Sequence, residues 1–574
     1  MSWLFGFIGP HLSPENTGRF QAVHPAPRVT FHSSTTYFAA GGLPETFLHG
    51  AFANEQRDAG WAVAGVGLER SGQNCRFLTG ADWQQILSAA SPPLKKLDGH
   101  FIAVRWKAET IECFTDQLGL RTLFLSALDG GAVFSTRLDW LAKLRRHNEV
   151  DFAACGSSWL TFNQIGYEAS LKNVRRLGPN GVAALSPASV QLHHAPWTPD
   201  LNYDSSGFVE ILEAFLHPAT SERVVSLGLS GGLDSRTLLA LLASQKRAEF
   251  SLHVFGLPDD PDVRLSRAMA SQENLPQDYF DDPLPKSPAC MQLLRDYAGQ
   301  MQFIEPASTW LKLRYGAELY NRKKIILDGG FGEIARRQFL NRFLFKGKAV
   351  LQSGNPDLIY PYLRVQRPPV FIPEILQTMR QGVEEQIAAL WQEMPAIEEI
   401  GAENFLDLVA IRTRLPNAYG FEQGRLDGEC LSFMPFAQPS FLRRLFQTPV
   451  ARRKNGRLFR QLIRQRFPRL TRYPLVKGGT TYPFGFSTVP AWAWTKLKTR
   501  LGQTFTDASA VDLLHQIAAE VQDLANSTSV KSYPVYDYPF IRNLVEKFYR
   551  GQTELAGSIH WWLAFELWRR AVNA

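Results

Sequence analysis

One six-residue run, Ser230-Gly231-Gly232-Leu233-Asp234-Ser235, combines residue types that bind phosphate. It follows an apolar stretch, residues 224–230, which is typical of a buried strand, and it precedes residues 235–245, which have helical periodicity. Its glycines can adopt positive φ and let a phosphate approach the backbone. Free amides at the start of the helix would face that anion, and the helix dipole favours it. The run therefore predicts a phosphate-binding loop.

The polar side chains of this loop extend the same interpretation. Ser230 and Ser235 add hydroxyl donors, and the Asp234 carboxylate suits a magnesium ion that bridges phosphate oxygens. The alternative is an ordinary glycine-rich turn with Asp234 as the helix N-cap. A Walker A motif is excluded, because the GxxxxGK[ST] spacing is absent. A hydrolase nucleophile elbow at residues 228–232 would leave Asp234 and Ser235 without a role.

The elements that must position the loop change character along the chain. Residues 1 to about 200 are β-rich, with short runs at 99–106, 110–115 and 131–135 separated by turns. Residues 196–206 are rich in Pro, Asp, Asn and Ser and predict a linker. From Phe208 onward strands and helices alternate, which favours a parallel sheet with crossover helices.

Composition limits the classes of protein that the chain can represent. It is 45% hydrophobic with a net charge of +8, which is ordinary for a globular protein of 574 residues. The five cysteines form no CxxC pair, which argues against a disulfide framework and a zinc site. The first residues lack the basic start and cleavage site of a signal peptide, so we expect none, and the sequence has no run of about 18 apolar residues. We expect a cytoplasmic protein that binds neither nucleic acid nor a membrane.

One basic segment leaves two interpretations open. Residues 441–472 hold eleven Arg and Lys and no acidic residue. They form either a solvated helix face or a surface for phosphate or peptide.

The loop resembles the pyrophosphate-binding loop of the N-type ATP pyrophosphatases, which transfer AMP to an acceptor oxygen. Other segments, in the same order along the chain, are similar to the asparagine synthetase-like group of that superfamily. They are His253-Val254-Phe255-Gly256, Asp260-Pro261-Asp262-Val263-Arg264, Asp328-Gly329-Gly330-Phe331-Gly332-Glu333 and Lys477-Gly478-Gly479, with Leu97-Asp98-Gly99-His100-Phe101, Thr115-Asp116-Gln117-Leu118-Gly119-Leu120-Arg121 and Val174-Arg175-Arg176-Leu177-Gly178-Pro179 in the N-terminal half.

This resemblance implies two domains. Residues 1–200 would form an α+β glutaminase-like (Ntn-type) domain with a β-sandwich, and residues 207–574 an α/β synthetase domain with a parallel sheet. The glutaminase half departs from the family, which needs a cysteine directly after Met1 where this chain has Ser2. A serine hydroxyl is a far poorer nucleophile than a thiolate at neutral pH. An Asn-Gly-Glu stretch that holds glutamine is also missing, so we expect no ammonia supply from glutamine.

Two relatives make amides without glutamine, the β-lactam synthetase type and the lasso-peptide cyclase type. The resemblance to them implies a carbon–nitrogen ligase that forms AMP and pyrophosphate through an acyl-adenylate, with ATP and Mg²⁺ as cofactors. It implies a carboxylate substrate, with a precursor peptide as the macrolactam candidate and a peptide-maturation protease as its partner. Two alternatives stay open: an ammonia-dependent asparagine synthetase, and a non-catalytic protein that binds a nucleotide or a peptide.

The resemblance also assigns residues to roles. Lys477 would stabilise charge on the adenylate. Gly330 stands where the family often has a Glu or Tyr that deprotonates the amine, so the base must come from elsewhere. Glu422 and Glu429 lie in the right region, and Glu429 is the expected catalytic residue. The cofactor-binding residues would be Ser230, Gly231, Gly232, Asp234 and Ser235, with Val254, Phe255 and Gly329 near the adenine, and the metal ligands Asp234 and Glu333.

Overall fold

The structure is a computed structural model. It describes residues 2–52, 58–72, 74–201, 207–216, 218, 223–245, 249–281, 283–477, 480–500 and 507–573. Gly478, Gly479 and residues 202–206 of the expected linker lie outside the described residues.

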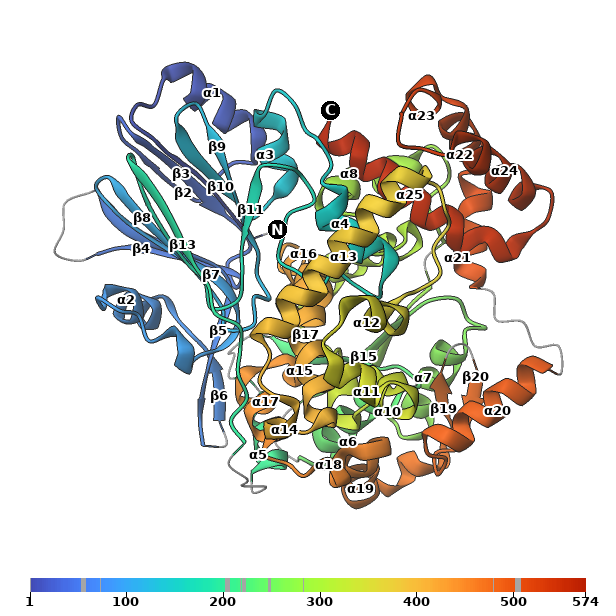
Figure 1. The fold of residues 1–574 in the computed structure, drawn as a ribbon. Helices are drawn as coiled ribbons and strands as arrows, with labels where there is room; N and C mark the ends of the chain where they lie inside the picture. The colour runs from blue at the N-terminus through green and yellow to red at the C-terminus, as the bar shows by residue number, and fades with distance from the viewer. Residues whose placement is uncertain are drawn as a thin grey trace.

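Two antiparallel sheets occupy the N-terminal part of the chain and pack face to face (Figure 1). One has six strands in the order β11-β9-β10-β1-β3-β2, and the other has seven, in the order β13-β12-β8-β7-β5-β4 with β6 paired to β5. The strands are β1 (Trp3–Ile8), β2 (Val29–His32), β3 (Thr36–Gly41), β4 (Phe47–Ala51), β5 (Ala59–Ser71), β6 (Asn74–Phe77), β7 (Asp98–Lys107), β8 (Thr110–Thr115), β9 (Leu123–Leu128), β10 (Gly131–Ser135), β11 (Val174–Leu177), β12 (Val182–Ser186) and β13 (Ser189–His193).

Both sheets are covered on both faces, which explains why a central strand such as β1 is buried along its whole length. In β1, Leu4 faces the core between the sheets, whereas Phe5 faces a second core shared with helices. Helices α1 (Pro14–Val23) and α3 (Leu138–Leu144) lie on that outer face. On the other sheet, Trp83 of α2 (Gly80–Ser88) packs against the outward side chains of β5 and β7. The order of layers is therefore helix, sheet, sheet, helix, in agreement with the predicted α+β sandwich.

A separate five-stranded sheet forms after residue 223, with all neighbouring strands parallel and the order β16-β15-β14-β17-β18. The chain runs outward from β14 in one direction and then returns to continue from β17 in the other. The loops after β14 and β17 therefore diverge, which leaves a crevice at the carboxyl edge of the sheet. The elements are β14 (Val224–Gly228), α6 (Leu233–Ser244), β15 (Phe250–Phe255), α7 (Pro261–Gln272), β16 (Gln277–Phe280), β17 (Lys324–Leu327) and β18 (Ser432–Phe433).

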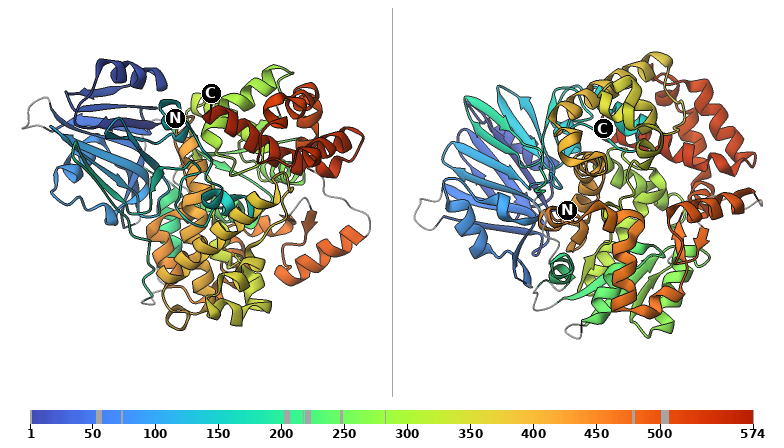
Figure 2. Two further views of the ribbon diagram at one scale, coloured as in Figure 1. Left: turned by 45° about the horizontal axis from the view of Figure 1, so that its top comes forward. Right: turned by 60° about the horizontal axis from the view of Figure 1, so that its bottom comes forward.

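Helices surround this sheet and fill the space toward the N-terminal sheets, as the two views of Figure 2 show. Two consecutive α-helices are joined by a π-helical turn. Such π turns are frequent at functional sites. They are α15 (Ala402–Arg414) and α16 (Gly420–Leu426), and the π turn between them is Leu415–Tyr419. The other helices of eight or more residues are α4 (Phe152–Leu160), α5 (Phe208–Leu216), α8 (Ala289–Met301), α9 (Arg314–Asn321), α12 (Pro356–Leu363), α13 (Pro373–Glu393), α17 (Pro439–Phe446), α19 (Arg457–Arg466), α20 (Thr488–Arg500), α21 (Ala508–Gln516), α22 (Ala518–Asn526), α24 (Tyr538–Tyr549) and α25 (Ala556–Val572).

The sequence-based expectations for these elements are confirmed where the structure describes them. The predicted strands at 99–106, 110–115 and 131–135 are β7, β8 and β10, and the predicted helix after the loop is α6. All five cysteines are buried and free. In the part of the chain that the structure describes, no helix is long and apolar enough to cross a membrane.

Helices α4 and α13 cross at two glycines, which allows their backbones to touch. A Cβ added at Gly382 would lie 2.1 Å from the carbonyl oxygen of Ala153, and one at Gly156 would lie 2.3 Å from that of Met379. Backbone atoms cannot move aside as the end of a side chain can, so any larger residue would force the helices apart.

We expect Gly382→Ala to lower the free energy of unfolding by about 1–3 kcal/mol, the usual cost of overpacking. The matched control is Gly18→Ala in α1, where an added Cβ would meet nothing within 4 Å. That variant should be neutral or more stable, because alanine is the better helix former. Denaturant unfolding of both variants tests the crossing, and a Gly382→Ala protein as stable as the control would contradict it.

Candidate active site

A cavity of about 570 Å³ opens at the carboxyl edge of the parallel sheet, between the loops that follow β14 and β17. This volume is within the range of small-molecule sites, about 300–1,000 Å³. Its lining includes Ser230, Gly232, Asp234 and Ser235 after β14, Val254 and Phe255 in β15, Asp260 and Asp262 after it, and Asp328, Gly329 and Gly330 after β17. The opposite wall includes Glu305, Thr309, Lys312, Tyr315, Glu422 and Arg425.

The predicted phosphate-binding loop is held in shape by its own hydroxyl groups. The Ser230 N–H donates to Ser235 Oγ at 3.1 Å, the Gly232 N–H donates to Ser230 Oγ at 3.1 Å, and the two hydroxyl oxygens lie 3.0 Å apart. The first turn of α6, which begins at Leu233, has amides without intrahelical partners. The serines therefore order the loop, and the helix start supplies the donors that an anion could use.

Gly231 does not face the cavity as the sequence suggests. Its N–H donates to Asp262 Oδ1 at 2.6 Å, and Val476 covers it from the other side. Burial raises the pKa of Asp262, and the Gly231 amide partly offsets this. A carboxylate of the chain itself thus occupies an amide that we expected to bind phosphate.

The two carboxylate oxygens of Asp234 differ in their hydrogen bonding. Oδ2 accepts from Arg336 Nη2 at 2.5 Å, whereas Oδ1 is buried without a partner. Burial raises the pKa of Asp234 to about 6, with a further rise from Glu333 and a reduction from Arg336. Glu333, the other expected metal ligand, accepts from the Tyr419 hydroxyl at 3.5 Å and does not line the cavity. Its metal role stays a prediction.

The far wall of the cavity carries ionisable groups that the sequence did not single out. Arg425 pairs with Glu305, and Lys312 Nζ lies 5.6 Å from the centre of the Phe255 ring. No spacing pattern in the sequence connects these residues, since residues 305 and 312 precede α9 and residue 425 belongs to α16.

Of the two glutamates considered for catalysis, the structure places Glu422 in the cavity and Glu429 outside it. Enclosure in the cleft raises the pKa of Glu422 to about 7, and the carboxylates of Glu305 and Asp328 contribute to this rise. Glu429 packs against Gly316, and burial raises its pKa as well. The geometry favours Glu422 as a base, and the role of Glu429 stays a prediction.

Lys477 lies beside the loop but not in the cavity lining. It ends β19 (Leu475–Lys477), which pairs with β20 (Thr480–Tyr482), and its side chain is exposed. The preceding Val476 N–H donates to the Gly231 carbonyl at 3.0 Å, so the hairpin is attached to the loop. The catalytic role of Lys477 stays a prediction, because the adjoining Gly478 and Gly479 lie outside the described residues.

The basic segment 441–472 is only partly a solvated face. Arg453 is fully buried and pairs with Asp407, and the largely buried Arg460 donates to the carbonyl oxygens of Phe484 and Phe486. Helix α19 packs against α6, directly behind the loop. Arg466 and Arg469, by contrast, are exposed, and they pair with Glu213 and with the largely buried Glu273 carboxylate.

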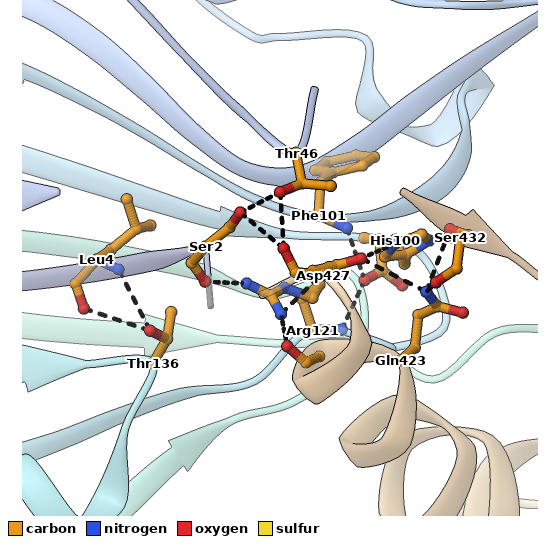
Figure 3. A network of polar contacts seen from close by, with 12 residues as sticks. Ser2, Leu4, Thr46, His100, Phe101, Arg121, Thr136, Gln423, Asp427 and Ser432 are labelled. Carbon is orange, nitrogen blue, oxygen red and sulfur yellow. Dashed lines mark hydrogen bonds and ion pairs between the residues drawn. The ribbon is translucent and has the colours of Figure 1, made fainter. Parts of the chain in front are cut away.

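Ser2, where the resemblance places a nucleophilic cysteine, is fully buried. Figure 3 shows its polar contacts. Its hydroxyl bonds to Thr46 Oγ1 and to the carbonyl oxygen of Asp427. The Asp427 carboxylate, at the end of α16, pairs with His100 at 2.8 Å and Arg121 at 3.2 Å. Asp427, from the C-terminal half of the chain, therefore helps to cover Ser2.

We expect Ser2→Cys to release no glutamate from glutamine above the wild-type background. A thiol at this position would be fully buried, and burial disfavours the reactive thiolate. An assay of glutamate release with purified variant and wild-type protein measures this directly. Glutamine hydrolysis by the variant would mean that the buried site opens in solution.

No family model matches the chain, and no curated protein does. Among solved structures, the chain is similar to "the allosteric regulatory enzyme of purine biosynthesis", at 12% identity over 67% of this chain and 91% of that one, with a TM-score of 0.23. It is also similar to glutamine phosphoribosylpyrophosphate amidotransferase from B. subtilis, at 12% identity over 67% and 92%, with a TM-score of 0.21. Scores this low carry no argument about this protein.

Proposed function

We propose that this protein is an ATP-dependent ligase that activates a carboxylate as an acyl-adenylate and then forms an amide. The main support is the position of the Ser230–Ser235 loop, which opens into a cavity of about 570 Å³. This cavity lies where the strand order reverses, between β14 and β17. Ligands of open α/β sheets bind in this crevice. Val254, Phe255 and Gly329, the residues expected near an adenine, line the same cavity.

In the proposed first step, the start of α6 binds the β- and γ-phosphates while the substrate carboxylate attacks the α-phosphate. The bond to pyrophosphate breaks, and the loop holds the leaving group. Since the serine hydroxyls already order the loop, little reorganisation is needed when the charge moves to pyrophosphate.

Magnesium fits this site as an ion that arrives with the nucleotide. Within the described residues, no group of three or more His, Cys, Asp or Glu side chains could hold a metal. The unpartnered Oδ1 of Asp234 offers one ligand, and Mg²⁺ commonly combines one or two carboxylates with phosphate oxygens. Such an ion would neutralise charge on the phosphates.

In the second step an amine attacks the acyl-adenylate and AMP leaves. Glu422 is our candidate for the group that takes the proton from the amine, because it lines the cavity and its pKa is raised to about 7. Since Ser2 is buried, we propose that the amine comes from the substrate itself, as in a macrolactam precursor peptide or a small ring-closing metabolite.

The products of ATP consumption test this proposal. Purified protein is incubated with ATP, Mg²⁺ and candidate acids, including peptides with a free N-terminus and an acidic side chain. We expect AMP and pyrophosphate. A parallel incubation with aspartate and ammonium tests the asparagine synthetase alternative, and formation of ADP and phosphate would contradict the proposal.

A non-catalytic binding protein is the second candidate, and one observation favours it. The Gly231 amide and Asp234 Oδ2 are both satisfied by the chain itself, through Asp262 and Arg336. A protein that only binds a nucleotide would tolerate this. Tight ATP binding without AMP release for any acid would support this candidate.

A further inference from the structure

Arg336 is fixed beside the loop by hydrogen bonds from its two terminal nitrogens and by packing of its aliphatic part. Its Nη2 lies 2.5 Å from Asp234 Oδ2, its Nη1 donates to Gln338 Oε1 at 2.9 Å, and Nε is buried without a partner. A Cβ at Gly456 would lie 3.5 Å from both Cγ and Cδ of Arg336, so the aliphatic part is packed as well. The side chain of Arg336 is 14% exposed, and that of Asp234 is 15% exposed. The guanidinium is therefore an ordered cation beside Asp234, which lines the cavity, although Arg336 itself is not part of that lining.

This cation stands where a protein-held metal ion would be expected. The charges of both Asp234 and Glu333 act on Arg336, and these are the two carboxylates for which the resemblance implies magnesium binding. The Gly332 backbone closes on Asp234 so tightly that a Cβ there would lie 2.5 Å from Asp234 Cγ. The carboxylate is thus held against the guanidinium, and Oδ1 is the oxygen that has no partner.

We propose that Arg336 is a pyrophosphate-binding residue that takes the place of a second, protein-held metal ion at the loop. This rests on the proposed function. Each terminal nitrogen of a guanidinium carries two hydrogens, so Nη1 and Nη2 each keep one donor beyond Gln338 and Asp234. The planar fork suits phosphate oxygens, and the guanidinium stays charged at all relevant pH.

The probe is α,β-methylene-ATP, titrated by calorimetry once with Mg²⁺ and once with EDTA. For the wild type, we expect the Kd in EDTA to stay within about 10-fold of that with Mg²⁺, because Arg336 supplies charge without a metal. Arg336→Met should weaken binding in EDTA by at least about 10-fold, the loss of one hydrogen bond between charged groups. Arg336→Lys should recover part of that loss. The control is Arg457→Met, next to Gly456 but exposed.

The ratio of the Kd in EDTA to the Kd with Mg²⁺ is the decisive readout, because a merely structural defect would weaken both alike. A larger ratio in Arg336→Met than in the wild type and the control supports the proposal. An unchanged ratio overturns it, even if binding falls. If Arg336→Met does not fold, Arg336→Lys decides, and a wild-type ratio for that variant overturns the proposal. Absence of nucleotide binding by the wild type would instead overturn the proposed function.

Discussion

Asp234→Ala should lower acid-dependent pyrophosphate exchange by at least about 100-fold, the usual cost of removing a group that stabilises transition-state charge. Asp234 is the only carboxylate within the loop, and its Oδ1 is buried without a partner. Its removal would eliminate the expected ligand of the nucleotide-borne ion and would free Arg336 from its present partner.

The measurement is incorporation of labelled pyrophosphate into ATP with an acid that supports exchange. Asp260→Asn is the control, because Asp260 also lines the cavity but serves as the N-cap of α7, a role that asparagine fulfils equally well. We expect normal exchange from this control. Exchange at the wild-type rate by Asp234→Ala would remove Asp234 from the mechanism.

Glu422→Gln should leave pyrophosphate exchange intact and reduce the coupled formation of AMP and amide by about 10²–10⁴-fold, the contribution of a general base. Only the deprotonated carboxylate can accept a proton. Since the pKa of Glu422 is raised to about 7, the wild-type rate of the second step should rise with pH up to about 7 and level off above it. The variant should lose this dependence.

Glu429→Gln provides the matched control for this second prediction. It changes the same residue type seven positions along the chain, outside the cavity lining. AMP formation is measured for both variants across pH 5.5–8.5, beside pyrophosphate exchange. A defect confined to Glu429→Gln would assign the base to the residue that the sequence suggested and would contradict the geometric argument.

Much of the fold follows from local sequence patterns. The apolar strand before Ser230 and the helix after it were predictable because hydrophobic periodicity and glycine placement are properties of neighbouring residues. For the same reason the predicted short strands of the N-terminal half coincide with β7, β8 and β10. Ser230 and Ser235 lie in the loop, but their hydroxyl groups bond to each other and to loop amides, and their role as donors to a phosphate stays a prediction.

The parts of the site that the sequence missed depend on contacts between distant segments. Asp262, in α7, accepts a hydrogen bond from Gly231, and Arg336 pairs with Asp234, which lies 102 positions earlier in the chain. Glu422 lies on α16 directly after the π turn and lines the cavity, whereas Glu429 lies beyond the end of that helix, and no spacing rule reveals such a turn. In each case the partner is chosen by tertiary packing.

The position of a bound nucleotide tests the central claim most directly. A crystal structure with α,β-methylene-ATP and Mg²⁺ should show the β- and γ-phosphates at the first turn of α6, with the adenine beside Val254 and Phe255. The Gly231–Asp262 contact would then either persist behind the phosphates or open to admit them. A nucleotide bound elsewhere, or a cavity that stays empty at saturating nucleotide, would contradict the account.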